Sequence, residues 1–143
     1  MAAENNLWTC TRTRFEKAGV FAQRLENAVS EGVPDVIVNE GPLCAWLENK
    51  ATKTWPVRPT SKVFGKDGLR PMQVNWLVNA AQRGLHAYVW AGVGVGHQRQ
   101  TFLVPCQYAE QFNDMARAQL EQYACEIDDL VAALRAGWRG GKG

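Results

Sequence analysis

Apolar and polar positions alternate most clearly in two short runs in the first half of the chain. Residues 33–39 (VPDVIVN) are rich in β-branched side chains, and residues 43–50 (LCAWLENK) follow them after a Glu-Gly-Pro turn signal. This pattern predicts an antiparallel hairpin. Two further strands are predicted at 85–92 and 101–105. The glycine-rich segment between them (GVGVGHQRQ) is expected to be a hairpin turn rather than a phosphate-binding loop, because no helix follows it.

Helical spacing characterises other parts of the chain. Pro71 suits the first turn of a helix and Gly84 suits its end, so a helix is predicted over Pro71–Arg83. A shorter helix is expected around Arg12–Ala18, whereas residues 20–31 fit either a helix or a strand. Residues 107–136 are expected to be helical, with an amphipathic stripe that packs into the core or, alternatively, pairs with a second copy. The stripe consists of Phe112, Met115, Leu120, Tyr123, Ile127, Leu130 and Leu134.

Length and composition place these elements in one globular unit. The chain has 143 residues, 46% of them hydrophobic and 21% charged, which suits a single structural domain with a real core. The net charge of +2 permits a nucleic-acid partner without requiring one. Four widely spaced cysteines form no CxxC pair and favour reduced thiols. Because the chain shows neither a signal peptide nor a membrane-spanning run, we expect a cytoplasmic protein with no membrane partner.

Three charged residues occur inside the two predicted strands of the hairpin. Glu48 and Lys50, two positions apart, share one face of their strand, and a hairpin can bring Asp35 beside Glu48. Two converging carboxylates repel each other unless a cation lies between them, and Mg²⁺ prefers oxygen ligands of this kind. Such a cluster suits metal-assisted hydrolysis of a phosphodiester, with the lysine stabilising developing charge. A surface ion pair is the alternative interpretation of so short a pattern.

The order of these residues resembles the PD-(D/E)xK nuclease superfamily. Pro34-Asp35 matches its first motif and Glu48-Asn49-Lys50 its second. Residues 24–36 and 69–84 are similar to segments of small phage-type nucleases in the branch of VRR-NUC proteins and Holliday-junction resolvases. The likeness extends over roughly residues 15–105. Asn49 departs from the apolar, small or basic residue common at that position, but it points to the face opposite Glu48.

The resemblance implies a fold, an activity and a set of site residues. The fold would be α/β and restriction-endonuclease-like, with a mixed sheet flanked by helices and a C-terminal helical extension. Residues 1–106 would form the nuclease core, and residues 107–143 the extension and a basic tail. Asp35, Glu48 and Glu26 would bind Mg²⁺ or Mn²⁺, Lys50 would be catalytic, and Gln73 would support them. The activity would be that of a DNA endonuclease, with a phage or prophage as its source.

A basic loop follows the second motif. Residues 51–70 contain a single acid, Asp67, and are expected to form a mobile segment that contacts DNA phosphates, although a solvated surface is the simpler alternative. Trp55 in this loop is suited either to stacking on an unpaired base or to capping the core. The candidate phosphate contacts are Lys53, Arg58, Lys62, Lys66 and Arg70.

Three functions compete at this level. The first is a metal-dependent endonuclease, selective for branched DNA such as a Holliday junction and able to act as a homodimer. The second is a non-catalytic nucleic-acid-binding module that keeps the fold. The third is a small virion or regulatory protein that binds other proteins through Trp8 and Trp138 as exposed anchors. The presence of Asp35, Glu48 and Lys50 together favours the enzyme.

Overall fold

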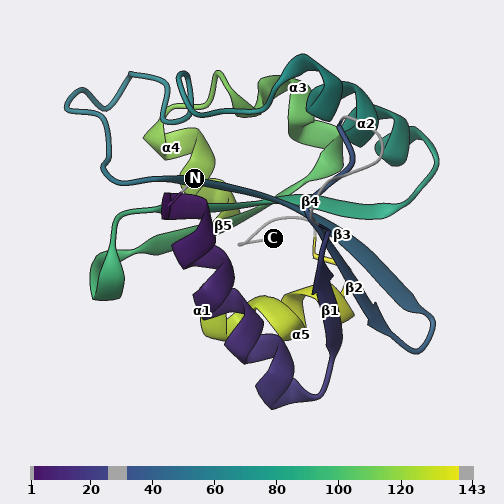
Figure 1. Ribbon diagram of the computed structural model, residues 1–143. Helices are drawn as coiled ribbons and strands as arrows, with labels where there is room; N and C mark the ends of the chain where they lie inside the picture. Colours follow the sequence, from purple (N-terminus) through teal and green to yellow (C-terminus); the bar gives the residue numbers. More distant parts are fainter. Residues whose placement is uncertain (1, 26–31, 139–143) are drawn as a thin grey trace.

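The computed structural model describes residues 2–25 and 32–138, which form a five-stranded mixed sheet between two layers of helices (Figure 1). The strands are β1 (Phe21–Arg24), β2 (Val36–Glu40), β3 (Leu43–Thr52), β4 (His86–Val93) and β5 (Gln100–Pro105). They lie side by side in chain order, with β3 and β4 parallel and every other pair antiparallel. The predicted β2–β3 and β4–β5 hairpins are therefore both present.

Helices cover the two faces of the sheet. On one face lie α1 (Ala2–Ala18) and α5 (Leu130–Arg135); on the other lie α2 (Pro71–Gln82) and α3 (Ala109–Phe112) (Figure 1). The remaining short helices are α4 (Arg117–Leu120) and the 3₁₀ turns η1 (Gly96–Gln98), η2 (Cys106–Tyr108), η3 (Glu121–Tyr123) and η4 (Ile127–Asp129). Within the two described stretches, no helix has both the length and the apolar character needed to cross a bilayer.

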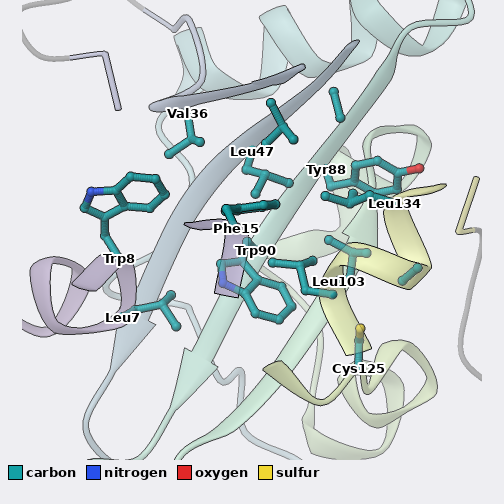
Figure 2. Packing of buried hydrophobic residues seen from close by; sticks show 14 of the residues in the cluster. Leu7, Trp8, Phe15, Val36, Leu47, Tyr88, Trp90, Leu103, Cys125 and Leu134 are labelled. Carbon is teal, nitrogen blue, oxygen red and sulfur yellow. The ribbon is translucent and has the colours of Figure 1, made fainter. Parts of the chain in front are cut away.

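Alternation along the central strands produces two separate cores. In β4, Tyr88 and Trp90 face α1, while Val89 and Ala91 face α2. Figure 2 shows the first core, where Phe15 of α1 packs among Trp90, Leu47 and Leu103 of the sheet and Leu134 of α5. Because both faces are covered, the middle of the sheet excludes solvent, and any charge placed there must be held by a specific partner.

Helix α1 is ten residues longer at its N-terminus than the predicted Arg12–Ala18. Its buried stripe recurs every four residues and includes Leu7, Thr11 and Phe15. Because Thr11 is polar, it interrupts the apolar stripe of α1 in the sequence. Its hydroxyl donates to Leu7 O at 2.7 Å and accepts from Trp90 Nε1 at 2.9 Å. A satisfied threonine can therefore occupy a core position that the hydrophobic pattern alone leaves blank.

The segment over residues 107–136, expected to be helical, is divided into short helices and 3₁₀ turns. The stripe divides, with Phe112 and Leu120 in the core under α2 and Leu130 and Leu134 in the core under α1. Between them the chain runs beside the edge of β5, where Cys125 N–H donates to Thr101 O at 3.0 Å. A single straight helix cannot cover both faces of a sheet, so the segment breaks into short turns.

Two other expectations are corrected by packing. The anchors proposed at Trp8 and Trp138 are not exposed, because Trp8 lies in the core and Trp138 is partly buried with its Nε1 donating to Leu103 O at 2.7 Å. The loop over residues 53–70 is anchored, because Phe64 and Leu69 are buried against the α2 side of the sheet. The loop is anchored rather than mobile because apolar residues lie among its cations. All four cysteines are free of disulfides.

Candidate active site

The register of the β2–β3 hairpin brings the two motif carboxylates together. Val36 pairs with Leu47, so Asp35, one residue earlier, faces Glu48, one residue later. Residues directly opposite in an antiparallel pair have their Cβ atoms about 4.5–5.5 Å apart. The carboxyl groups of Asp35 and Glu48 are close enough for each to shift the pKa of the other. Asp35 Oδ2 also accepts the backbone N–H of Asn49 at 3.3 Å, which orients the aspartate across the strands.

Glu48 is one of the most deeply buried side chains, with 2% of its surface exposed. Its Oε2 accepts a hydrogen bond from Gln73 Nε2 at 3.1 Å and lies 3.9 Å from Lys50 Nζ. Its Oε1 is buried and has no hydrogen-bond donor. Burial, reinforced by the negative charge of Asp35, raises the pKa of Glu48 to about 9, although Lys50 opposes the shift.

Asp35 shares this electrostatic problem. Burial raises its pKa above the usual value, while its hydrogen bonds with Glu48 and the Asn49 amide and the charges of Lys50 and Arg24 act in the opposite direction. With its pKa raised to about 9, the carboxyl group of Glu48 retains a proton at neutral pH when no cation is bound. A cation placed at the pair would remove the need for that proton.

Lys50 completes the group on this face of β3. It lies two residues after Glu48 on the same strand, is nearly buried, and holds its ammonium close to Glu48 Oε2. A lysine confined in this way cannot sweep through solvent as surface lysines do. Its charge is thus directed at whatever group approaches the carboxylate pair.

Gln73 connects the site to the first turn of α2. Its Oε1 accepts the backbone N–H of Arg70 at 2.9 Å, which caps the helix, while its Nε2 donates to Glu48. Gly32, at φ +88°, lies against the same turn, since a Cβ there would clash with Met72 O. The segment that leads to Asp35 and the helix that carries Gln73 are consequently packed against each other.

Glu4 is a further acidic residue whose charge acts on Glu48 and Asp35, and the sequence analysis did not identify it. It lies in the first turn of α1, partly buried. Burial raises its pKa, the charge of Lys50 opposes the rise, and the charge of Asp35 adds to it. The four-residue stripe of α1 indicates a helix that starts near residue 2, but only the packing of α1 under the sheet brings its first turn to the site. Glu26, the acid predicted for this role, lies outside the described residues.

The donor set fits a hard divalent cation bound in part by water or substrate. Across residues 2–25 and 32–138, no group of three or more His, Cys, Asp or Glu is arranged to hold a metal ion. The pair formed by Asp35 and Glu48 nevertheless includes a buried carboxylate oxygen without a donor. Mg²⁺ is commonly held by one or two carboxylates, with water and phosphate oxygens completing its shell. The residues present therefore suit Mg²⁺ or Mn²⁺.

The predicted phosphate-binding residues lie on the surface. Lys53, Arg58, Lys66 and Arg70 are exposed, while Lys62 is engaged with Asp114 at 2.8 Å. A cleft of about 350 Å³ opens beside Glu4, between the first turn of α1 and the loop that follows β3. Its lining residues are Ala3, Glu4, Ala51, Thr52, Lys53, Thr54 and Asp67.

Comparison with solved structures identifies the fold. The chain is similar to Hjc from Archaeoglobus fulgidus, a Holliday junction resolvase from an archaeal hyperthermophile. The TM-score is 0.57 at 22% sequence identity, and the match covers 87% of this chain and 97% of Hjc. The restriction-endonuclease-like α/β fold is confirmed. No protein-family model matches the sequence, and no curated protein matches it.

Proposed function

We propose that this chain is a metal-dependent endonuclease that hydrolyses phosphodiester bonds in DNA. The observation that carries the proposal is the convergence of Asp35, Glu48 and Lys50 on one buried face, with an unpartnered oxygen of Glu48 at its centre. Buried carboxylates that repel each other are costly to a fold and are retained at sites that bind cations or move protons. A surface ion pair does not explain a glutamate that is 2% exposed.

Each residue has a distinct part in the proposed reaction. A bound Mg²⁺ or Mn²⁺ supplies Lewis-acid polarisation of the phosphate and lowers the pKa of water. Asp35 and Glu48 would hold the cation, and the Asn49 amide and Gln73 keep the two carboxylates in place. The Lys50 ammonium donates to a phosphate oxygen or to the attacking water and stabilises the negative charge that develops.

Branched DNA is the proposed substrate class. The support is the similarity in fold to a Holliday junction resolvase, together with the cationic loop beside the site. Resolving a four-way junction takes two cuts, which a two-fold pair of copies would deliver symmetrically. Light scattering of the protein with a four-way junction should then show a dimer. A strict monomer on DNA would direct the assignment to a nicking or flap activity.

The decisive experiment measures cleavage and binding side by side. Purified protein is incubated with labelled linear, flapped and four-way DNA in Mg²⁺, Mn²⁺ or EDTA. We expect metal-dependent cleavage that falls about 10²–10³-fold in Lys50→Ala, the usual loss of one preorganised electrostatic group. Asp35→Asn should lose more because it removes a charged ligand, and excess Mn²⁺ should rescue it in part. If wild type binds these DNAs but cuts none of them, the chain is a binding module.

A further inference from the structure

Val57 is the most exposed apolar side chain of the described residues. Its relative exposure is 101%, so no part of the folded chain covers it. The other large apolar side chains on the described surface keep about half of their area against the protein; Phe21, Met72, Leu85 and Val95 are 45–60% exposed. Single apolar residues on surfaces are ordinary. The function of a fully exposed valine has to be argued from the rigidity and charge of the loop that carries it.

Val57 belongs to residues 56–62, which form the tip of the loop that follows β3. Trp55 fixes the loop directly before this tip. The indole Nε1 donates to Gln100 Oε1 at 2.8 Å, and the ring meets Phe102 edge-on with centroids 5.6 Å apart. Arg117 covers the ring, its Cζ 4.1 Å from the centroid. Three contacts of different kinds hold this tryptophan, so it is a structural anchor of the loop rather than a free platform for a base.

The loop is fixed again after its tip. Val63 N–H donates to Met115 O at 3.0 Å, and the Phe64 ring stacks on Phe112 with centroids 5.0 Å apart. Between the two anchors, Pro56 and Pro59 restrict the backbone. The tip is therefore held in one shape before any partner arrives, which lowers the ordering cost of inserting it into that partner.

The surroundings of the tip indicate a polyanionic partner. Residues 51–66 contain four cations and no acid. Lys53 and Arg58, on either side of Val57, are exposed. Val57 follows Lys50 by seven residues, and seven residues of extended chain span at most about 25 Å. At about 3.4 Å per base pair, this limit places the tip within about seven base pairs of the proposed catalytic centre on any DNA bound there.

We propose that Val57 is a wedge that inserts at an interrupted base stack in DNA, while Lys53 and Arg58 contact the flanking phosphates. Apolar side chains inserted between base steps must unstack them, at about a few kcal/mol per step in intact duplex. At a branch point the stack is already interrupted, so insertion there avoids much of that cost. The wedge consequently selects branched over linear DNA. This inference rests on the proposed function, because it assigns the substrate feature that the same site would act on.

The test uses 2-aminopurine placed next to the branch point of a four-way junction. Glu48→Gln protein in Mg²⁺ should bind this DNA without cutting it. The fluorescence of the 2-aminopurine should rise as that base unstacks. Adding Val57→Ser should remove the rise and reduce the preference for junction over linear duplex about tenfold, the factor expected when one valine side chain is no longer buried. Val57→Leu, which keeps an apolar tip, should retain both.

Val95→Ser is the matched control, since Val95 is a half-exposed valine in the turn between β4 and β5. It should behave like its parent in fluorescence and in binding preference. Circular dichroism of Val57→Ser should equal that of its parent, because the replaced side chain contacts nothing. The wedge is overturned if Val57→Ser retains the fluorescence rise and the preference, or if the parent protein shows neither.

The outcome is separable from that of the nuclease proposal. Fluorescence and relative affinity are measured without cleavage, so a wedge can be demonstrated in a protein that cuts nothing. Conversely, if wild type cleaves junctions and Val57→Ser keeps the same preference among substrates, the nuclease proposal is supported and the wedge proposal is contradicted.

Discussion

Gln73 Nε2 donates a 3.1 Å hydrogen bond to Glu48 Oε2 inside the protein. The same amide accepts the Arg70 N–H at 2.9 Å through its oxygen. One side chain thereby caps α2 and orients the carboxylate that is central to the proposed metal site. Its removal should affect both the stability of the fold and the chemistry, and suitable substitutions can separate the two effects.

Gln73→Leu and Gln73→Glu should both lose activity, but Gln73→Leu should be the less stable of the two because it also loses the helix cap. Leucine removes both hydrogen bonds and should lower the free energy of unfolding by about 1–3 kcal/mol. Glutamate keeps the acceptor for Arg70 N–H but places a second carboxyl against Glu48 Oε2, so cleavage should fall while the cap persists. Urea unfolding and cleavage rates measure the two effects. Gln82→Leu, on the exposed end of α2, is the control. A Gln73→Glu enzyme with full activity would limit Gln73 to helix capping.

Glu48 should make the metal-free protein lose stability as pH rises. Its folded pKa is raised above the unfolded value, so the folded state holds the proton more tightly and its advantage is fully present below the unfolded pKa of 4.5. That advantage is lost as pH increases toward the folded pKa of about 9. The slope is at most about 1.4 kcal/mol per pH unit for one proton.

Thermal unfolding in EDTA between pH 5 and pH 9 checks this effect. Glu48→Gln cannot ionise and should flatten the decline, becoming more stable than wild type at alkaline pH. Added Mg²⁺ should stabilise wild type most at high pH, where the carboxylates are ionised, and should have little effect on the variant. Parallel pH profiles for the two proteins would contradict the assignment of the shared proton to Glu48.

Glu4→Gln should impair cleavage although Glu4 is distant in sequence from every motif. The charge of Glu4 interacts with those of Lys50 and Asp35, so its loss changes the charge around the lysine of the proposed active site. We expect a loss in turnover smaller than the about 10²–10⁴-fold that a positioned acid or base contributes, and a higher Mg²⁺ requirement. Glu16→Gln, exposed on the same helix, is the matched control. Equal activities of the two variants would exclude Glu4 from the site.

The basic loop should set the salt dependence of DNA binding. The triple replacement of Lys53, Arg58 and Arg70 by alanine should reduce the slope of log K against log salt by about 2.7, three contacts at 0.9 each. Lys62→Ala alone should change the slope less, because Lys62 is paired with Asp114. A triple replacement of exposed cations elsewhere, at Arg12, Lys17 and Arg83, serves as the control. An unchanged slope in the loop variant would place DNA on another surface.

Local periodicity alone determined the part of the site carried by the hairpin. Alternation puts Glu48 and Lys50 on one face of β3 whatever the rest of the fold does, and the short turn restricts the register that brings Asp35 opposite Glu48. The helix that begins at Pro71 could also be predicted from the sequence, since proline and glycine mark its ends. These features depend on neighbours a few residues apart, which a sequence displays directly.

Only the tertiary structure decided which distant residues join that hairpin. Glu4 reaches the site because α1 packs under the sheet, and no local pattern specifies where the first turn of a helix will lie. The apolar stripe after Phe112 is locally helical in spacing, yet it divides because its two halves bury against opposite faces of the sheet. Burial of apolar surface responds to the whole chain, and here it overrides the local preference for one continuous helix.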